Sequence, residues 1–159
     1  MTGETAGVKV GGSCGGEDVG MTISSGAYRS TTALNGGGVY LSSGAELASY
    51  AQFEENSATG DGGGIWAASG CTIYLNGNEN YRGLLSRNTA ARGSGMYVVG
   101  AQWTVEFNGT QVDSDNDLHF LGDGSNSKNY GVLRIGDRGD DESIIRGNIQ
   151  AINVNVTMD

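Results

Sequence analysis

A glycine triplet that recurs along the chain restricts its fold more than any other feature. In three segments, two or three glycines are followed by an aliphatic and then by an aromatic residue. The triplets begin 26 and then 31 residues apart, in Gly36-Gly37-Gly38-Val39-Tyr40, Gly62-Gly63-Gly64-Ile65-Trp66 and Gly93-Ser94-Gly95-Met96-Tyr97. A period of this length is typical of a solenoid, in which each repeat stacks on its neighbours.

Each repeat has room for three strands of about five residues with three turns between them. The alternative for this period is one strand and one helix, as in a leucine-rich repeat. A helix is disfavoured because no apolar stripe with helical spacing extends over about ten residues. Glycines also interrupt nearly every window, at about 1 kcal/mol each relative to alanine in a helix. The sequence therefore predicts an all-β fold, a short parallel β-helix with about three strands per coil.

Glycine at one point of every coil indicates a tight corner. The next coil lies about 4.8 Å away, so the corner requires either a positive φ or the absence of a Cβ. Before the second and third triplets, an apolar residue stands three positions ahead of an asparagine, and we expect these asparagines to stack as a ladder of side-chain amides. The residues predicted for the turns and the ladder are Gly36, Gly37, Gly38, Asn56, Gly62, Gly63, Gly64, Asn88, Gly93 and Gly95.

Tyr40, Trp66 and Tyr97 follow the inward-pointing aliphatic residues directly. Side chains alternate between the two faces of a strand, so these aromatic residues point away from the core. The sequence predicts an aromatic stripe on the outside of the stack.

The pairing of Phe-x-x-Asn (Phe53 to Asn56) with Gly-Gly-Gly-Ile (Gly62 to Ile65) resembles the repeats of polymorphic outer-membrane proteins. Those repeats carry FxxN and GGA(I/L/V) tetrapeptides, and the resemblance, over about residues 30–120, implies a right-handed β-helical passenger domain. This chain departs from the pattern at Gly64, where alanine is usual, at Leu85, which replaces Phe, and at Ser94, which replaces the middle Gly.

The chain divides into three parts around these repeats. Residues 1–29 are expected to form an N-terminal cap or first coil, residues 30–120 the glycine-rich β-helix, and residues 121–159 degenerate C-terminal coils or cap strands. The longest alternating run, Ile149 to Met158, places Ile152, Val154 and Val156 on one face and predicts an end strand able to pair with a neighbour.

The charge balance limits the possible partners. Eighteen Asp and Glu against nine Lys and Arg give a net charge of −9, which disfavours nucleic acid and anionic membrane surfaces. No apolar stretch of about 18 residues predicts a membrane span, and the first residues do not form a signal peptide. The chain is then either cytoplasmic or a mature or excised piece, and the neutral-polar composition favours the second, an extracellular or cell-surface module.

Asp113, Asp115 and Asp117 form the sharpest local cluster. Alternate carboxylates in a loop are suitable ligands for Ca²⁺, which makes calcium the candidate cofactor. The spacing is not that of an EF-hand, because Leu118 and Gly124 stand where Gly and Glu are required. The competing interpretation is a solvated acidic turn.

Two covalent modifications are candidates. Cys14 and Cys71 form a disulfide, within or between chains, or remain two separate thiols. They lie 57 residues apart, close to two coils or about 10 Å, which exceeds the roughly 7 Å Cα separation of a disulfide unless the N-terminal segment folds back. Asn108 and Asn155 begin Asn-x-Thr sequons for N-glycosylation.

Three functions fit a short β-helix. The first is an extracellular structural or adhesive module that self-assembles or belongs to a larger surface protein or filament, with partners that are copies of itself, neighbouring domains or carbohydrate. The second is a polysaccharide-binding or polysaccharide-degrading β-helix, which would use carboxylates such as Glu54, Glu55 and Asp61 about 5–9 Å apart. The third is ice binding, which needs a regular threonine array that this sequence lacks. We assign no catalytic residue and expect no enzymatic activity.

Overall fold

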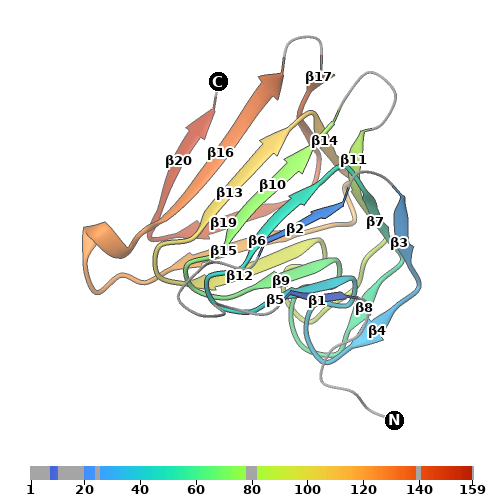
Figure 1. Ribbon diagram of the computed structural model, residues 1–159, viewed down its shortest axis with the longest axis horizontal. Helices are drawn as coiled ribbons and strands as arrows, with labels where there is room; N and C mark the ends of the chain where they lie inside the picture. Colours follow the sequence, from blue (N-terminus) through green and yellow to red (C-terminus); the bar gives the residue numbers. More distant parts are fainter. Residues whose placement is uncertain (1–7, 11–19, 24–25, 78–81, 139–140, 159) are drawn as a thin grey trace.

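The chain forms a parallel β-helix. The computed structural model describes residues 8–10, 20–23, 26–77, 82–138 and 141–158. In these residues, the strands of one coil belong to different sheets, apart from the hairpin of β16 (Gly131–Arg138) and β17 (Asp141–Glu142), and strands one coil apart lie side by side (Figure 1). The all-β fold class with three main strands per coil is confirmed. Within the described residues, no helix is long and apolar enough to cross a membrane.

Three sheets make up the stack, and sheets 1 and 2 extend through all six coils. Sheet 1 contains β1 (Val8–Val10), β5 (Val39–Leu41), β9 (Ile65–Ala67), β12 (Met96–Gly100), β15 (Leu118–Gly122) and β19 (Ile149–Ile152). Sheet 2 contains β2 (Gly20–Ile23), β6 (Glu46–Ser49), β10 (Thr72–Asn76), β13 (Thr104–Asn108), β16 (Gly131–Arg138) and β20 (Val154–Met158). Sheet 3 contains β3 (Ala27–Arg29), β7 (Gln52–Glu54), β11 (Gly83–Ser86), β14 (Thr110–Val112) and β18 (Ile144–Ile145).

Six coils follow from this order. They are β1–β4, β5–β8, β9–β11, β12–β14, β15–β18 and β19–β20, numbered one to six below. The first two coils add the short parallel pair β4 (Thr32–Ala33) and β8 (Ser57–Ala58). The fifth coil adds a 3₁₀ turn (Ser127–Asn129) and β17 (Asp141–Glu142), which pairs antiparallel with β16. The described strands of the two terminal parts of the chain thus lie in the same sheets as the central repeats.

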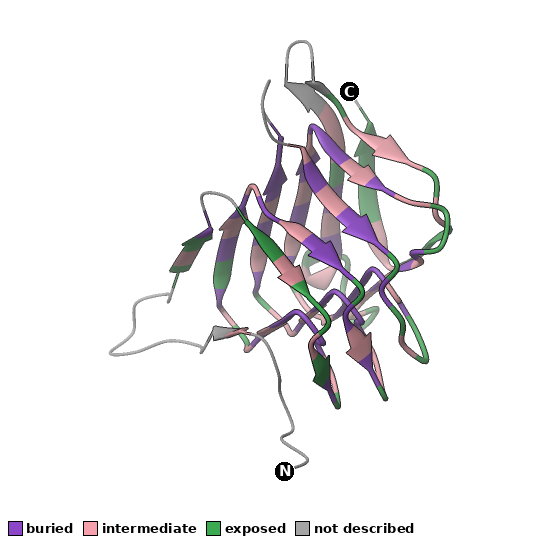
Figure 2. Cartoon of the chain, turned by 90° about the vertical axis from the view of Figure 1, so that its right-hand side faces the viewer, coloured by how far each residue is buried: buried purple, intermediate pink, exposed green. Residues whose placement is uncertain are grey.

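Strand register explains the core. In β10, Ile73 lies between Leu47 and Val105, and Leu75 lies next to Phe107, so that apolar side chains stack in columns inside the coil. Thr72 and Tyr74 alternate with these residues along β10, face outward and are half-buried, as expected for a strand with one solvated face. Figure 2 shows the same alternation of buried and more exposed positions along the central strands.

Aromatic side chains fill the core of the fourth and fifth coils. Trp103, Phe107 and Phe120 are each fully buried, and the Trp103 and Phe120 ring centroids lie 5.6 Å apart. Gly131 makes room for the indole, because a Cβ on it would lie 2.1 Å from a carbon of the Trp103 ring.

The prediction of one long strand over Ile149 to Met158 is wrong. Asn153 has a φ of 55°, and at this corner the chain leaves β19 in sheet 1 and enters β20 in sheet 2. Asparagine tolerates this left-handed conformation better than most residues. The alternating pattern therefore continues through a corner instead of marking a single strand.

Candidate functional site

The glycine triplets form the corner that leads into sheet 1. Gly36, Gly62 and Gly93, the first residues of the three triplets, have φ angles of 64°, 68° and 57°. These values lie in the left-handed region, which glycine adopts without a steric cost. The first position of each triplet is thus set by backbone conformation.

The second and third triplet positions are set by the closeness of the next coil. A Cβ on Gly63 would lie 2.5 Å from the carbonyl oxygens of Ser94 and Thr89, and one on Gly64 would lie 2.6 Å from the Gly95 oxygen. Alanine, usual in the resembled repeats at the Gly64 position, therefore does not fit this stack. Ser94 fits because its hydroxyl donates to the Asp115 carbonyl and accepts from the Asp117 N–H.

A ladder of amide side chains follows sheet 3. Asn56 Nδ2 donates to Asn88 Oδ1 at 3.1 Å, and Asn88 Nδ2 donates to Asn116 Oδ1 at 2.8 Å. The three asparagines are at most 2% exposed. Thr31 extends the ladder into the first coil, where its hydroxyl donates to Asn56 Oδ1 at 2.8 Å. The amides of Asn56 and Asn88 also donate to backbone oxygens, as in the 2.8 Å contact from Asn88 Nδ2 to the Phe53 oxygen. We call Thr31, Asn56, Asn88 and Asn116 the Asn ladder.

The residue directly before each of the first three members of the Asn ladder has a left-handed backbone conformation. Ser30, Glu55 and Arg87 have φ angles of 56°, 57° and 51°. Their position, directly before the ladder residue, shows that Tyr28 to Thr31 is a first copy of the Phe-x-x-Asn unit. The residue pattern does not reveal this copy because tyrosine replaces Phe and threonine replaces Asn.

Charged side chains beside the Asn ladder pair from coil to coil. Glu54 is buried and accepts from Arg29 of the first coil and from Arg87 of the third, both at 3.1 Å. Arg87 also pairs with Glu55 at 2.9 Å, and this hydrogen-bonded carboxylate raises the pKa of the guanidinium. These contacts hold three successive coils together at one corner.

The remaining ion pairs of the described residues follow the same rule. Arg92 binds Asp61 through two hydrogen bonds of 2.8 and 2.6 Å, which raise the pKa of the arginine. Arg134 pairs with Glu106, and Arg146 lies 3.8 Å from Asp113. Glu54 and Asp61, named above as candidate catalytic carboxylates, are therefore both bound by arginines of a neighbouring coil.

Loss of the Glu54 charge is expected to destabilise the stack. Glu54→Gln removes a buried acceptor of two arginines, and we expect the free energy of unfolding to fall by about 1–2 kcal/mol, because the half-exposed arginines regain water. Glu55→Gln, at a half-exposed position of the same turn, is expected to cost less than about 0.5 kcal/mol. Urea unfolding of both variants measures the difference, and equal costs would contradict the bridging role of Glu54.

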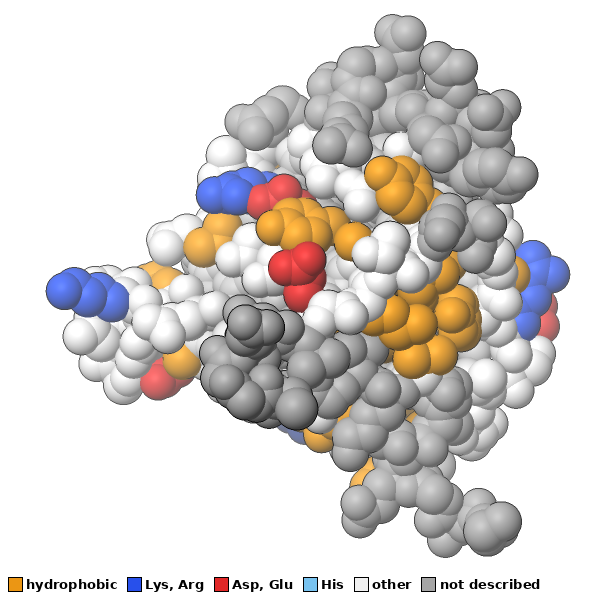
Figure 3. Space-filling view, viewed as in Figure 1, with side chains coloured by type: hydrophobic (Ala, Val, Ile, Leu, Met, Phe, Trp, Pro, Cys, Tyr) orange, Lys and Arg blue, Asp and Glu red, His pale blue; other side chains and the backbone are white. Residues whose placement is uncertain are grey.

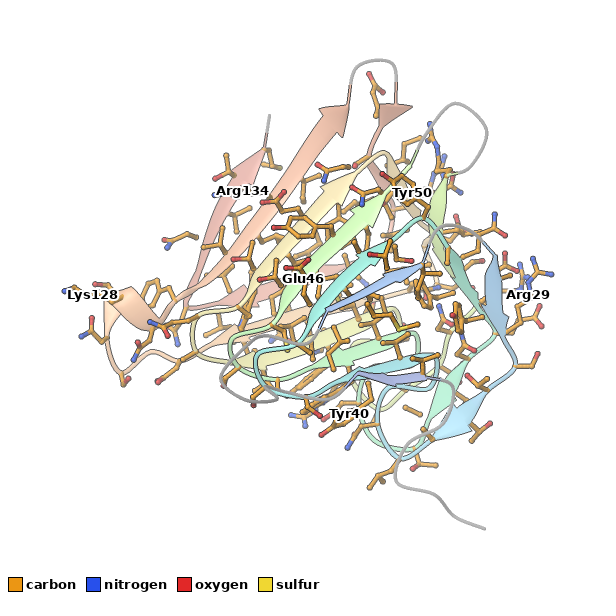
Figure 4. The ribbon with its side chains drawn as sticks, viewed as in Figure 1. Arg29, Tyr40, Glu46, Tyr50, Lys128 and Arg134 are labelled. Carbon is orange, nitrogen blue, oxygen red and sulfur yellow. The ribbon has the colours of Figure 1, made fainter. Side chains whose placement is uncertain are left out.

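The aromatic residues Tyr40, Trp66 and Tyr97 lie at equivalent positions of sheet 1, and the first two are stacked on each other. Tyr40 and Trp66 have ring centroids 4.4 Å apart and planes within 11° of parallel, and Figure 4 places Tyr40 well away from Arg134 on sheet 2. Tyr97 is only 4% exposed, with the Arg92 guanidinium carbon 4.9 Å from its ring centroid. Tyr40 and Trp66 are half-buried and cover one ring face of each other, whereas Tyr97, predicted to lie on the outside with them, is buried.

The three acidic residues of the predicted calcium site have separate partners. Asp113 Oδ1 accepts from Gln111, Asp115 Oδ2 accepts from the Arg87 N–H, and Asp117 Oδ1 accepts from Asn148. Among the described residues, no three His, Cys, Asp or Glu side chains form a group that could hold a metal ion. Calcium binding stays a prediction, and the structure shows these carboxylates joining neighbouring coils and turns.

Cys71 is a free thiol with no exposed surface, and its Sγ lies 3.1 Å from the Ser42 oxygen. Burial raises the pKa of this thiol above its usual 9.0, the largest cause being desolvation. Cys14 lies outside the described residues, so the predicted disulfide remains untested.

Cys71 is expected to be unreactive in the folded protein. In a Cys14→Ser variant, alkylation at neutral pH is expected to be at least about 100-fold slower in buffer than in urea, because reaction requires an exposed thiolate. Because the pKa of Cys71 is higher in the folded than in the unfolded chain, its protonated thiol also contributes to stability. This contribution is fully present below the unfolded pKa of about 9 and is lost as the pH rises through the folded pKa. Fast alkylation without urea would contradict the burial of Cys71.

The two glycosylation sequons differ in exposure. Asn155 and Thr157 are exposed on β20. Asn108 is half-buried and donates to Asn76, while the Thr110 hydroxyl is fully buried and donates to the Leu75 oxygen at 2.7 Å. Asn155 is thus the more accessible of the two predicted sites.

Comparison of the chain with protein-family models, with curated proteins and with solved structures gave no match. The likeness to polymorphic outer-membrane protein repeats therefore rests on the tetrapeptide motifs.

Proposed function

We propose that the chain is an extracellular or cell-surface structural or adhesive β-helix module without enzymatic activity. The observation that carries this proposal is the use of its charged side chains. Five arginines pair with acidic residues 25 to 33 positions away, which lie on an adjacent coil. Charges used in this way join the coils of a rigid stack, and they are then not held ready for acid–base chemistry.

The composition of the outer surface is consistent with a structural function. Polar uncharged side chains and backbone predominate on the face in Figure 3, and charged groups are few. Every buried side-chain nitrogen or oxygen atom in the described residues has a hydrogen-bond partner, which is typical of a well-specified, rigid interior. The partners that fit such a module are further copies of itself, neighbouring domains of a larger chain, or surface carbohydrate.

Two measurements on the purified chain test this proposal. Binding to immobilised polysaccharides and cell surfaces should occur without release of reducing ends or unsaturated products, and electron microscopy with and without a calcium chelator should show whether the metal changes assembly. Turnover of any polysaccharide that is lost in Asp61→Asn or Glu54→Gln would overturn the proposal in favour of a carbohydrate-active enzyme.

A further inference from the structure

The sixth coil leaves the apolar columns of the core uncovered. Val156 lies next to Leu133, and Ile149 lies next to Leu118. Leu133 and Leu118 are fully buried, but Ile149 is 42% and Val156 is 48% exposed. Four of the five large apolar side chains that are exposed in the described residues belong to this coil, namely Ile149, Ile152, Val156 and Met158. We call these four residues the end face, and Figure 2 shows the strand nearest the C-terminus as exposed.

The backbone of the sixth coil is unpaired on its outer side. Within the described residues, β19 pairs only with β15, and β20 pairs only with β16. Folded proteins usually protect such edges with charged residues, proline or a bulge. Residues 147–158 contain no charged residue and no proline. The end face thus combines exposed apolar side chains with free strand edges, which is typical of an interaction surface.

The described residues of the first coil offer less exposed apolar surface than the end face. Ile23 is 6% exposed, and Val8, Met21 and Tyr28 are half-buried against the core. A head-to-tail stack would place the end face against this smaller apolar surface. Among the described residues, the apolar surface that best matches an end face is therefore the same face of a second copy.

Charge does not oppose contact between two end faces. Two copies of a protein with a net charge of −9 repel each other at most orientations. Opposed end faces bring together residues 147–158, which are neutral, so the repulsion is weakest there. Two copies that meet through identical faces are related by a two-fold axis. Their contact therefore closes as a dimer and does not grow into a filament.

We infer that two copies of the chain dimerise tail to tail through the end face, with β20 of one copy against β20 of its partner. This inference rests on the proposed function and names the partner as a second copy of the chain. The dimer is one rod of two stacks, with both N-terminal coils at its outer ends.

Sedimentation equilibrium over a range of concentrations tests the inference. The wild type is expected to change from the 16.4 kDa monomer to twice that mass. Val156→Lys places a charge on the end face and is expected to raise the dimer dissociation constant at least about 100-fold. Thr157→Lys, the next residue on the solvated side of β20, is expected to change it less than about threefold. Circular dichroism of both variants establishes that they fold.

Spin labels determine the orientation in a Cys14→Ser background. Labels on Thr157→Cys are expected to give a short distance between copies, whereas labels on Ala27→Cys of the first coil are expected to lie about 50 Å apart, because about eleven coil spacings of about 4.8 Å separate them. A monomer at all concentrations, open-ended polymers, or a dimer insensitive to Val156→Lys would each overturn the inference. A monomer that still binds surfaces without turnover would leave the proposed function intact, whereas turnover by an intact dimer would overturn the proposed function alone.

Discussion

Gly63→Ala is expected to lower the free energy of unfolding by about 3 kcal/mol or more, because its Cβ would meet two backbone carbonyls of the next coil. Both carbonyl oxygens would lie 2.5 Å from that Cβ. Backbone atoms inside a stack cannot move independently, so the coil spacing itself must change. Urea unfolding followed by far-ultraviolet circular dichroism measures the loss.

Two other glycines serve as controls. Gly70 has a φ of 72° but an open environment, in which the nearest atom would lie 3.5 Å from an added Cβ, so Gly70→Ala is expected to cost only the backbone strain of about 1 kcal/mol. Gly20→Ala, with its nearest contact at 3.8 Å, is expected to be close to neutral. If Gly63→Ala costs no more than Gly70→Ala, the coils at this corner are not as close as described.

Asn88→Ala is the second change with a large expected effect, a loss of about 3–5 kcal/mol, because each buried group left without a partner costs about 1–3 kcal/mol. The side chain of Asn88 accepts from the N–H and the Nδ2 of Asn56, and it donates to the Phe53 carbonyl and to Asn116 Oδ1. Thermal unfolding monitored by the fluorescence of the buried Trp103 follows the loss.

Asn148→Ala is the matched control for this variant. Asn148 also stands three residues after an apolar residue, Ile145, but it is exposed and makes one side-chain bond, to Asp117 at 2.9 Å. Its replacement is expected to cost less than about 0.5 kcal/mol. Similar losses for Asn88→Ala and Asn148→Ala would mean that the Asn ladder contributes little to stability.

The repeat predicted the fold because stacking requires the same residue types at the same point of every coil. Gly36, Gly62 and Gly93 occupy equivalent corners, and Val39, Ile65 and Met96 fall in one inward column, although 26 residues separate the first pair and 31 the second. Changes in repeat length are absorbed in the turns, so the strand positions stay in register.

The candidate site was predicted less completely, because several of its members do not follow the residue pattern. Thr31 and Asn116 belong to the Asn ladder, but one is a threonine and the other follows Val112 by four residues instead of three. The pairing of Glu54 with arginines from both sides depends on which coils are adjacent, which no local motif shows. The position of Arg92 over the ring of the buried Tyr97 was not predicted either.

The Asn ladder also bears on how the molecule resists force. It links the first four coils, from Thr31 to Asn116, and does not continue, since Asn116 Nδ2 turns to Asp115 and Asn148 faces solvent. In a linear stack each coil contacts only its neighbours, so tension along the axis removes coils one at a time from the ends. Coils five and six should therefore peel away first, and the laddered coils should yield at a higher load.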